Sequence, residues 1–490
     1  MKNFNIKKLS ILLALILLFA LPLLLIVVKH QQNINSRAAA PDQLEAEGGI
    51  LGGNAKIQTD SLASGGQYVA LGTSLTPTPT PNPITNAFYV SPTGSDSNPG
   101  TQVSPWKTIQ KAANTLTAGQ TAIVLDGTYT QAQITFANNG TPTNPITIKA
   151  QNKWGAILAS TSSTFCSPSF SIDKSWITID GIRITTAPGA VNGCSSPSSA
   201  NGAARCWGTN DHPNPANPST GTVGCTFRNV KVDYSAVKDV GIKTNQDYAL
   251  VENSEIHNSI EAFNSFSPIY RNNVVYGSDV WGTSIFGKGG VRNMQIYNNI
   301  VHNGNGVLIG GAAGGSTSWD DVQQFEAYNS VAYDNVVINE SGTGVTVGIG
   351  MNGAVDSAVF NNVIIGGVIY LWSGSTPTAK STNPTFKNNI VVCNNTAATN
   401  GGWGWDWLGT LTTDYNLFYN CTGGVPSQTH PITGNPNFVN SASDWHLNSG
   451  SPAIGTGIPV TFTGYNGEVI DVSKNFDGLI RTAPWNLSIY

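Results

Sequence analysis

The chain has 490 residues, of which 11% are charged, and its formal net charge is -4. This length is enough for a large core and for more than one domain. The sparse, slightly acidic charge excludes nucleic acid as a partner, because phosphate recognition needs a basic surface.

The N-terminus carries an apolar run behind three lysines. Residues 9–28 are apolar except for Ser10 and Pro22. At about 1.5 Å per residue, such a run can cross the roughly 30 Å apolar core of a bilayer. The sequence therefore predicts a signal-anchor helix over residues 1–30, with the rest of the chain membrane-anchored at the cell surface. The alternative is a cleaved signal peptide, which gives a secreted protein.

Residues 31–86 are predicted to form a low-complexity stalk. Within them, residues 43–72 resemble the opening strands of a carbohydrate-binding β-sandwich, but they are too few to close a sandwich core. Residues 76–83 alternate Thr or Asn with Pro, which indicates a stiff, extended linker. The folded domain is expected over residues 87–490.

A short amphipathic helix is predicted at the start of the folded domain. Ser104 is expected to cap a helix that begins at Pro105. Apolar residues recur behind it at helical spacing, namely Trp106, Ile109, Ala112, Ala113 and Leu116. Gly119 ends this helix, and a strand follows over residues 121–125. A helix in front of many strands suits the open end of a solenoid.

The rest of the chain repeats one pattern: an apolar residue, a polar residue, Asn, a second polar or Asn residue, then strand residues. Clear copies are FRNVKV (227–232), IYNNIV (296–301) and FKNNIV (386–391). The first Asn recurs at irregular gaps. Constant strand motifs with variable gaps indicate the stacked coils of a solenoid.

The second motif position is predicted to form a buried ladder, in which each side chain bonds to the turn of the next coil. Its expected members are Ser254, Asn273, Asn299, Ser330, Asn362 and Asn389. The alternative is that Asn marks only exposed turns.

The six cysteines favour disulfides over a zinc site, because the chain is exported and contains no C-x-x-C pair. Cys393 and Cys421 each follow the first Asn of their coil by five residues. They therefore occupy equivalent places on adjacent coils, within the Cα–Cα distance that a disulfide needs. We predict the pair Cys393–Cys421. The sequence leaves open how the other four pair, namely Cys166, Cys194, Cys206 and Cys225.

Offsets from the first Asn also align chemically active residues. Lys243 and Lys288 both lie ten residues before their Asn, which predicts one column, and Glu261 belongs to the coil between them. A second column, four residues after the Asn, contains Asp233, His257, Tyr276, His302 and Tyr333. The adjoining turns carry Asp239, Asp279 and Trp281. Basic, acidic and aromatic groups are thus predicted to share one face.

The repeat resembles the pectate-lyase-like superfamily. This resemblance implies an all-β fold, a single right-handed parallel β-helix over about residues 87–490. The opening motif YVSPTGSDSNPGT…PWKTIQKA (89–112) is similar to that of many bacterial extracellular members, and so are the endings at 434–457 and 476–485. These motifs specify the fold better than the activity, since lyases, hydrolases, epimerases and non-catalytic surface proteins share it.

Within this resemblance, the predicted face suits β-elimination of a uronate polymer. That reaction needs a base for the proton α to the carboxylate and positive charge for the enolate. Lys288 is predicted as the base, since a lysine near another cation loses its proton more readily. Lys243 is predicted to neutralise substrate charge. His257 and His302 are predicted to protonate the leaving oxygen.

Further roles are predicted for the remaining residues of this face. Ca²⁺ is expected to bind through the oxygen ligands of Asp239, Glu261 and Asp279. Sugar rings are expected to stack on the flat faces of Tyr276, Trp281 and Tyr333.

One segment departs from the related enzymes. IFGKGGVRN (285–293) resembles the segment with the catalytic lysine in chondroitinase- and alginate-lyase-type β-helices, which also carry an Arg on the matching strand of the next coil. Here that strand reads VLIGGAAGG (307–315), without Arg. Two alternatives to a lyase therefore stay open: a non-catalytic, glycan-binding adhesin, and a glycoside hydrolase that pairs Glu261 with Asp279 or Asp239. In each case the expected partner is polysaccharide and the protein a monomer.

Overall fold

The computed structural model describes residues 55–59, 67–71, 87–161, 168–187, 203–208, 221–233, 240–277, 283–311, 325–340, 348–372, 380–397, 407–487 and 489–490. The predicted membrane helix lies outside them, as do Asp239, Asp279 and Trp281. None of the helices among the described residues is both long and apolar enough to cross a bilayer. The chain divides into residues 1–83 and 84–490. In the first unit, β1 (Ala55–Thr59) pairs antiparallel with β2 (Gln67–Leu71).

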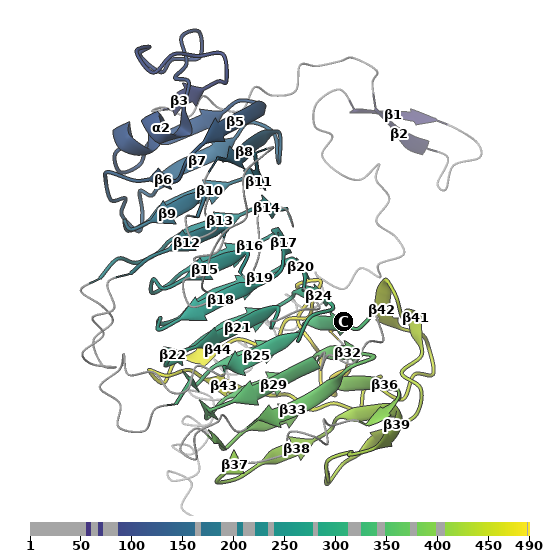
Figure 1. Ribbon diagram of the computed structural model, residues 1–490. Coiled ribbons are helices and arrows are strands. Elements are labelled where there is room, and N and C mark those ends of the chain that lie inside the picture. Colours follow the sequence, from purple (N-terminus) through teal and green to yellow (C-terminus); the bar gives the residue numbers. More distant parts are fainter. Residues whose placement is uncertain are drawn as a thin grey trace, which may run out of the picture. The chain divides into compact units, whose positions relative to one another are not determined.

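The second unit is a right-handed parallel β-helix, as predicted. Its coils run through three long parallel sheets, and in later coils through a short fourth sheet (Figure 1). Sheet I contains β3 (Ala87–Val90), β4 (Thr121–Val124), β7 (Ile146–Ala150), β10 (Ile177–Asp180), β13 (Thr226–Arg228), β16 (Leu250–Glu252), β19 (Ile269–Arg271), β23 (Gln295–Tyr297), β27 (Val331–Tyr333), β31 (Ala358–Phe360), β35 (Thr385–Lys387) and β38 (Thr412–Asp414).

Sheet II contains β5 (Gly127–Gln131), β8 (Ala156–Ser160), β11 (Arg183–Thr186), β14 (Lys231–Val232), β17 (Glu255–His257), β20 (Val274–Tyr276), β24 (Ile300–His302), β28 (Val336–Ile338), β32 (Val363–Ile365), β36 (Ile390–Ala397), β39 (Leu417–Gly423) and β40 (Ile432–Thr433). Sheet III contains β6 (Ile134–Thr135), β9 (Phe170–Ile172), β12 (Ala204–Cys206), β15 (Ile242–Thr244), β18 (Ile260–Phe263), β21 (Ile285–Lys288), β25 (Val307–Gly310), β29 (Gly348–Asn352) and β33 (Val368–Trp372). Sheet IV contains β22 (Val291–Arg292), β26 (Ala327–Tyr328), β30 (Ala354–Val355), β34 (Ser381–Thr382) and β37 (Trp407–Leu408).

Stacks of like aliphatic residues fill the interior. On sheet II, one inward column consists of residues with no exposed surface: Ile256, Val275, Val301, Val337, Ile364 and Val391. Because side chains alternate between the two faces of a strand, their neighbours in sequence point outward. The fold thereby presents every second residue of each strand on the surface of the coil.

Helix α2 (Ile109–Thr115) packs against β3, β6 and β7 at the N-terminal end of the coils, as the sequence predicted. Its start differs from the prediction. The cap is Thr108, whose hydroxyl accepts a hydrogen bond from the Lys111 amide, and not Ser104. Pro105 and Trp106 instead lie beside β3, where the Trp106 amide donates to the Tyr89 carbonyl. Apolar spacing alone did not show that Pro105 and Trp106 lie outside the helix.

The buried asparagine ladder is confirmed, with one corrected member. Each backbone amide donates to the side-chain oxygen of the next coil's Asn over 2.9–3.1 Å. The residue before it has positive φ in each of these coils, which Asn tolerates better than most residues. The ladder consists of Ser254, Asn273, Asn299, Asn335, Asn362, Asn389 and Asn416, and Gln428 ends it by bonding to Asn416.

The assignment of Ser330 to this ladder was wrong. Ser330 belongs to the turn between sheets IV and I, where its hydroxyl accepts from the Met294 amide and its own amide donates to Ser357. Sheet IV adds a second turn of the same kind, with positive φ at Asn293, Asn329, Asp356 and Asn383. Both turns therefore look alike in sequence.

Replacing Asn335 by alanine is expected to lower the free energy of unfolding by about 3 kcal/mol. The reason is that Asn335 has no exposed surface, accepts from Asn299 and donates to Asn362, so its loss leaves buried groups unpaired. Denaturant titration measures the change. The matched control is Asn466→Ala in an exposed turn, with an expected change within about 0.5 kcal/mol. Equal stability of the two variants would show that the ladder contributes little.

Two disulfides are described. Cys393–Cys421 joins adjacent coils of sheet II with a Cα–Cα distance of 4.9 Å, which confirms the prediction. Cys206–Cys225 links the end of β12 to the residue before β13, with a Cα–Cα distance of 6.3 Å. Cys166 and Cys194 lie outside the described residues.

After β40 the chain turns back as a tail, residues 434–490. It contains two hairpins, β41 (Phe438–Asn440) with β42 (Asp444–Leu447) and β43 (Phe462–Thr463) with β44 (Val469–Ile470). The tail packs apolar side chains on the outward faces of sheets I and II over the later coils. This cover explains why outward positions there are apolar, for example Ile338 and Ile365 on sheet II and Phe360 on sheet I.

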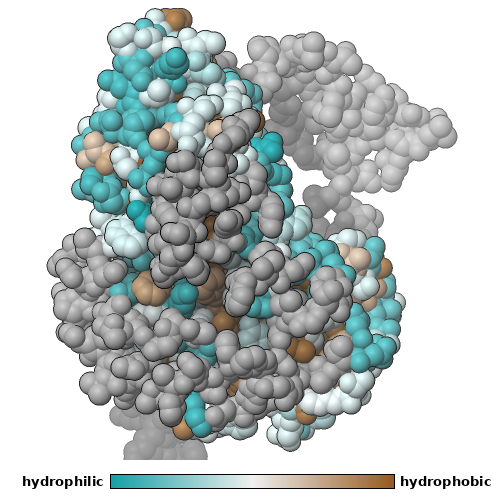
Figure 2. All heavy atoms as spheres, in the orientation of Figure 1, coloured by the Kyte–Doolittle hydropathy of each residue, from teal (hydrophilic) through white to brown (hydrophobic). Residues whose placement is uncertain are grey.

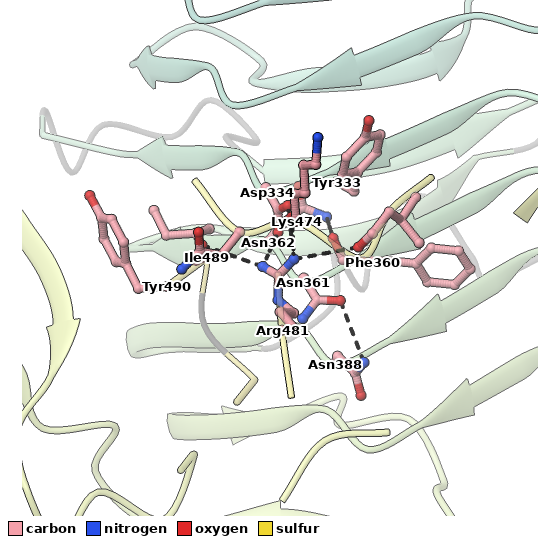
Figure 3. Close-up of polar contacts among 12 residues, drawn as sticks. Tyr333, Asp334, Phe360, Asn361, Asn362, Asn388, Lys474, Arg481, Ile489 and Tyr490 are labelled. Carbon is pink, nitrogen blue, oxygen red and sulfur yellow. Dashed lines mark hydrogen bonds and ion pairs between the residues drawn. The ribbon is translucent and has the colours of Figure 1, made fainter. Parts of the chain in front are cut away.

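A buried ion pair fastens this tail. The Arg481 guanidinium lies 2.5 Å from an Asp334 carboxylate oxygen, and the two side chains are 4% and 1% exposed. Figure 3 shows that Arg481 also reaches the carbonyls of Lys474 and Ile489. Burial raises the pKa of Asp334 to about 7, and Arg481 partly opposes this rise. Asp334 takes the positive-φ position that Asn298 and Asn361 take in the neighbouring coils.

Candidate functional site

Two predicted lysines meet at one carboxylate on the outward face of sheet III. The Oε1 atom of Glu261 lies 3.5 Å from Nζ of Lys243 and 3.3 Å from Nζ of Lys288. The Glu261 side chain is 3% exposed, whereas Lys243 and Lys288 are 19% and 28% exposed. The cluster can therefore present two ammonium groups to a ligand while Glu261 holds them together from beneath. Lys288 is the more accessible of the two.

The lysines share a face but not a column. Lys243 pairs with Glu261, whereas Lys288 pairs with Phe263, two residues farther along the strand. The predicted alignment was therefore wrong by two residues. The cause is turn length, because Ile242 precedes Asn253 by 11 residues while its equivalent Ile285 precedes Asn298 by 13. An even shift leaves both side chains on the same side of the sheet.

Sequence reasoning missed a third cation in this face. Arg205 pairs with Lys243 on one side and Ser171 on the other, so it stands directly beside the cluster. Burial lowers the pKa of Arg205 and Asp173 raises it, but a guanidinium stays charged at neutral pH. The next motif Asn, Asn229, lies 24 residues after Arg205, whereas each lysine lies ten residues before its Asn, so offset counting could not align Arg205.

Each of these cations lies over an aromatic ring. The distances to the ring centroids are 4.8 Å for Arg205 over Trp207, 5.2 Å for Lys243 over Phe263 and 5.2 Å for Lys288 over Phe286. Such contacts hold a flexible cation in place. We name these six residues and Glu261 the basic–aromatic strip. It crosses β12, β15, β18 and β21, which lie one above another in Figure 1.

On the face in Figure 2, the described residues of the N-terminal coils are mostly hydrophilic, and hydrophobic residues form small separate patches. A surface of this kind suits a hydrated, polar ligand better than a large apolar one.

Three members of the second predicted column do align, on sheet II. His257, Tyr276 and His302 pair in register, and their rings stack at centroid distances of 5.0 and 4.9 Å. Both faces of Tyr276 are thus covered, so no sugar ring can stack there. Burial lowers the pKa of His257, and Glu255 partly opposes this. Nδ1 of His302 lies 2.8 Å from Glu340.

Tyr333 does not belong to this column. It lies on β27 of sheet I, is 6% exposed and stacks on Tyr297 at a centroid distance of 4.7 Å. Ile338 occupies the predicted place beside His302. The mistaken register has the same origin as that of Ser330, because Asn329 opens the extra turn of sheet IV. Tyr333 is therefore not available as a sugar platform.

The Ca²⁺ site predicted from the sequence is mostly beyond the described part of the chain, since Asp239 and Asp279 lie outside it. Among the described residues, there is no group of three His, Cys, Asp or Glu side chains that could hold a metal ion. The third predicted ligand, Glu261, already has two ammonium neighbours.

Fold and site together define a parallel β-helix with an outward basic–aromatic strip. Residues 88–212 match the family model described as Pel9A-like, right handed beta helix region. The resemblance drawn from the repeat is thereby confirmed for the fold.

The chain is also similar to individual proteins. The chain is 33% identical over 101 residues to an uncharacterized protein, YwoF, of Bacillus subtilis (strain 168), and spans about a fifth of that protein's length (20% of this chain, 21% of YwoF). The structure of XylC in complex with xylose has a TM-score of 0.51 at 11% identity, over 82% of this chain and 98% of that one. Pectate lyase Pel9A gives 0.43 at 15% identity, over 82% and 96%. The similarity to XylC shows the fold alone.

Proposed function

We propose that this protein is a lyase that cleaves an acidic, uronate-containing polysaccharide by β-elimination. The observation that carries the proposal is the convergence of Lys243 and Lys288 on Glu261 in an outward face. Two ammonium groups and a nearby guanidinium attract a polyanion. The named relatives add weight to a saccharide ligand, since one is described as a pectate lyase and another was solved with xylose.

The roles follow from accessibility and charge. Lys288 acts as the base and takes the proton from the carbon α to the substrate carboxylate. The electron pair forms a carbon–carbon double bond as the bond to the glycosidic oxygen breaks. Lys243 stabilises the negative charge that builds up on the carboxylate. The departing oxygen takes a proton, for which His257 and His302 on the adjoining sheet II stay the predicted donors.

Glycoside hydrolysis is a weaker reading of the same face. It needs two carboxyl groups on either side of the bond. Glu261 is almost fully buried beneath two lysines, and its predicted partners Asp239 and Asp279 lie outside the described residues. Binding of Ca²⁺ by these three residues and anchoring at the cell surface stay predictions.

The test uses the full-length chain and a panel of polygalacturonate, alginate, chondroitin sulfate and a neutral glucan, each with and without Ca²⁺. Ultraviolet absorbance follows the unsaturated ends that β-elimination forms. Absorbance from at least one acidic polymer supports the proposal. New reducing ends without absorbance would indicate a hydrolase, and binding without any product would indicate an adhesin.

A further inference from the structure

One end of the basic–aromatic strip has unused binding capacity. Nε of Arg205 donates to the Ser171 hydroxyl over 3.0 Å. Among the described residues, its two terminal nitrogens have no hydrogen-bond or ion-pair partner. A guanidinium whose terminal donors are open matches a carboxylate or sulfate through two parallel hydrogen bonds.

The adjoining Trp207 is exposed yet held firmly. Its side chain is 39% exposed, and Arg205 lies over its ring. Its carbonyl accepts hydrogen bonds from Thr222 at 2.9 Å and Gln246 at 3.3 Å. The residue between Arg205 and Trp207 is Cys206, which the buried disulfide to Cys225 fixes. A fixed aromatic ring at the surface loses little conformational freedom when a ligand binds.

We infer that Arg205 and Trp207 form an outer binding subsite for one acidic sugar unit, separate from the lysine cluster where cleavage is proposed. The sugar ring lies on the exposed part of Trp207, and its carboxylate or sulfate accepts from Arg205. This inference rests on the proposed function, because it takes the ligand to be the same acidic polysaccharide.

The register sets the direction of the bound chain. Arg205, Lys243 and Glu261 are in register on successive coils, and Lys288 lies on the next one. Each step is about 4.8 Å, so the subsite lies roughly 14 Å from Lys288 along the helix axis. That distance exceeds one sugar ring. A polysaccharide crossing both places must run along the axis, and a disaccharide centred on Lys288 ends short of Arg205.

The test is titration calorimetry on the full-length Lys288→Ala protein, which keeps substrates intact. The probes are disaccharides and octasaccharides of galacturonate, alginate and chondroitin sulfate. Arg205→Gln is expected to weaken octasaccharide affinity roughly tenfold or more and to leave disaccharide affinity unchanged. Trp207→Ala is expected to act likewise, whereas Trp207→Phe keeps a ring and most of the affinity. The matched control is Arg183→Gln, a 41% exposed arginine on sheet II.

The outcomes separate the two proposals. Thermal melts of each variant show whether it is folded. If octasaccharides bind but folded Arg205→Gln and Trp207→Ala bind them as well as the parent does, the subsite is wrong and the lysine cluster stands. If the disaccharide weakens equally, Arg205 belongs to the central site and the subsite is again wrong. If no acidic oligosaccharide binds the parent, both proposals fail.

Discussion

Replacing Lys288 by alanine is expected to lower kcat/KM on the cleaved polymer by about 10²- to 10⁴-fold, the usual contribution of a positioned proton acceptor. Alanine removes the more exposed amine of the cluster and leaves Lys243 paired with Glu261, so substrate attraction is largely retained. The loss is therefore expected in kcat more than in KM. The rate of ultraviolet absorbance increase measures it.

Two further variants are needed to interpret the Lys288→Ala result. Lys149→Ala removes an exposed lysine of sheet I and is expected to leave kcat/KM unchanged. Lys243→Ala is expected to raise KM mainly, because Lys243 acts on substrate charge. Full activity in a folded Lys288→Ala protein would exclude Lys288 as the base, whatever the protein cleaves.

Replacing Arg481 by methionine is expected to lower the free energy of unfolding by about 3–5 kcal/mol. The reason is that the Asp334 carboxylate would stay buried without its cation, and the tail would lose its bonds to the Lys474 and Ile489 carbonyls. Denaturant unfolding and the loss of tail protection in hydrogen exchange both measure the effect.

The double variant Asp334→Asn with Arg481→Met provides the control. Asn fits the positive-φ position that Asp334 occupies, as Asn298 and Asn361 show in neighbouring coils. Removing both charges is expected to recover most of the lost stability. If the double variant is as unstable as Arg481→Met alone, the cost comes from packing and not from the buried charge.

The same pair gives a pH dependence with a defined sign. The pKa of Asp334 is raised to about 7 in the folded protein, above its value in the unfolded chain. Its contribution to stability is therefore fully present below about pH 4 and is lost as the pH rises through 7. Wild type is expected to lose stability relative to the double variant between pH 4 and pH 7. Parallel pH profiles for the two proteins would contradict this assignment.

The fold could be predicted because its repeat depends on local chemistry. From β14 to β39, Asn takes the positive-φ position, the buried ladder position or both before each strand of sheet II, and this pattern is visible in the sequence. The Cys393–Cys421 pair was predicted from the equal distance of each cysteine from its motif Asn. Counting residues from the motif Asn gave a wrong register only where a turn changed length. The extra turn of sheet IV displaced Tyr333 and Ser330, and the longer turn after β21 displaced Lys288.

The candidate site could be predicted only in part, because a site depends on contacts between coils. Counting residues placed Lys243, Glu261 and Lys288 together. The register of Lys288 was wrong by two residues, but a shift by an even number leaves its side chain on the same face of sheet III. Arg205 was missed because 24 residues separate it from the next motif Asn, Asn229, instead of the ten that follow each lysine. That the tail covers Ile338 and Ile365 was not foreseeable either, because nothing local tells which strands a returning tail will cover.

The returning tail changes how the molecule can come apart. In a simple solenoid each repeat touches only its neighbours, so coils can peel away from an end one at a time. Here the tail bonds directly to Asn293, Asp334, Asn361 and Asn388, which stand on four different coils. None of these coils can detach while the tail is in place. The C-terminal half is thus expected to melt as one cooperative block, with fraying confined to the coils before Asn293.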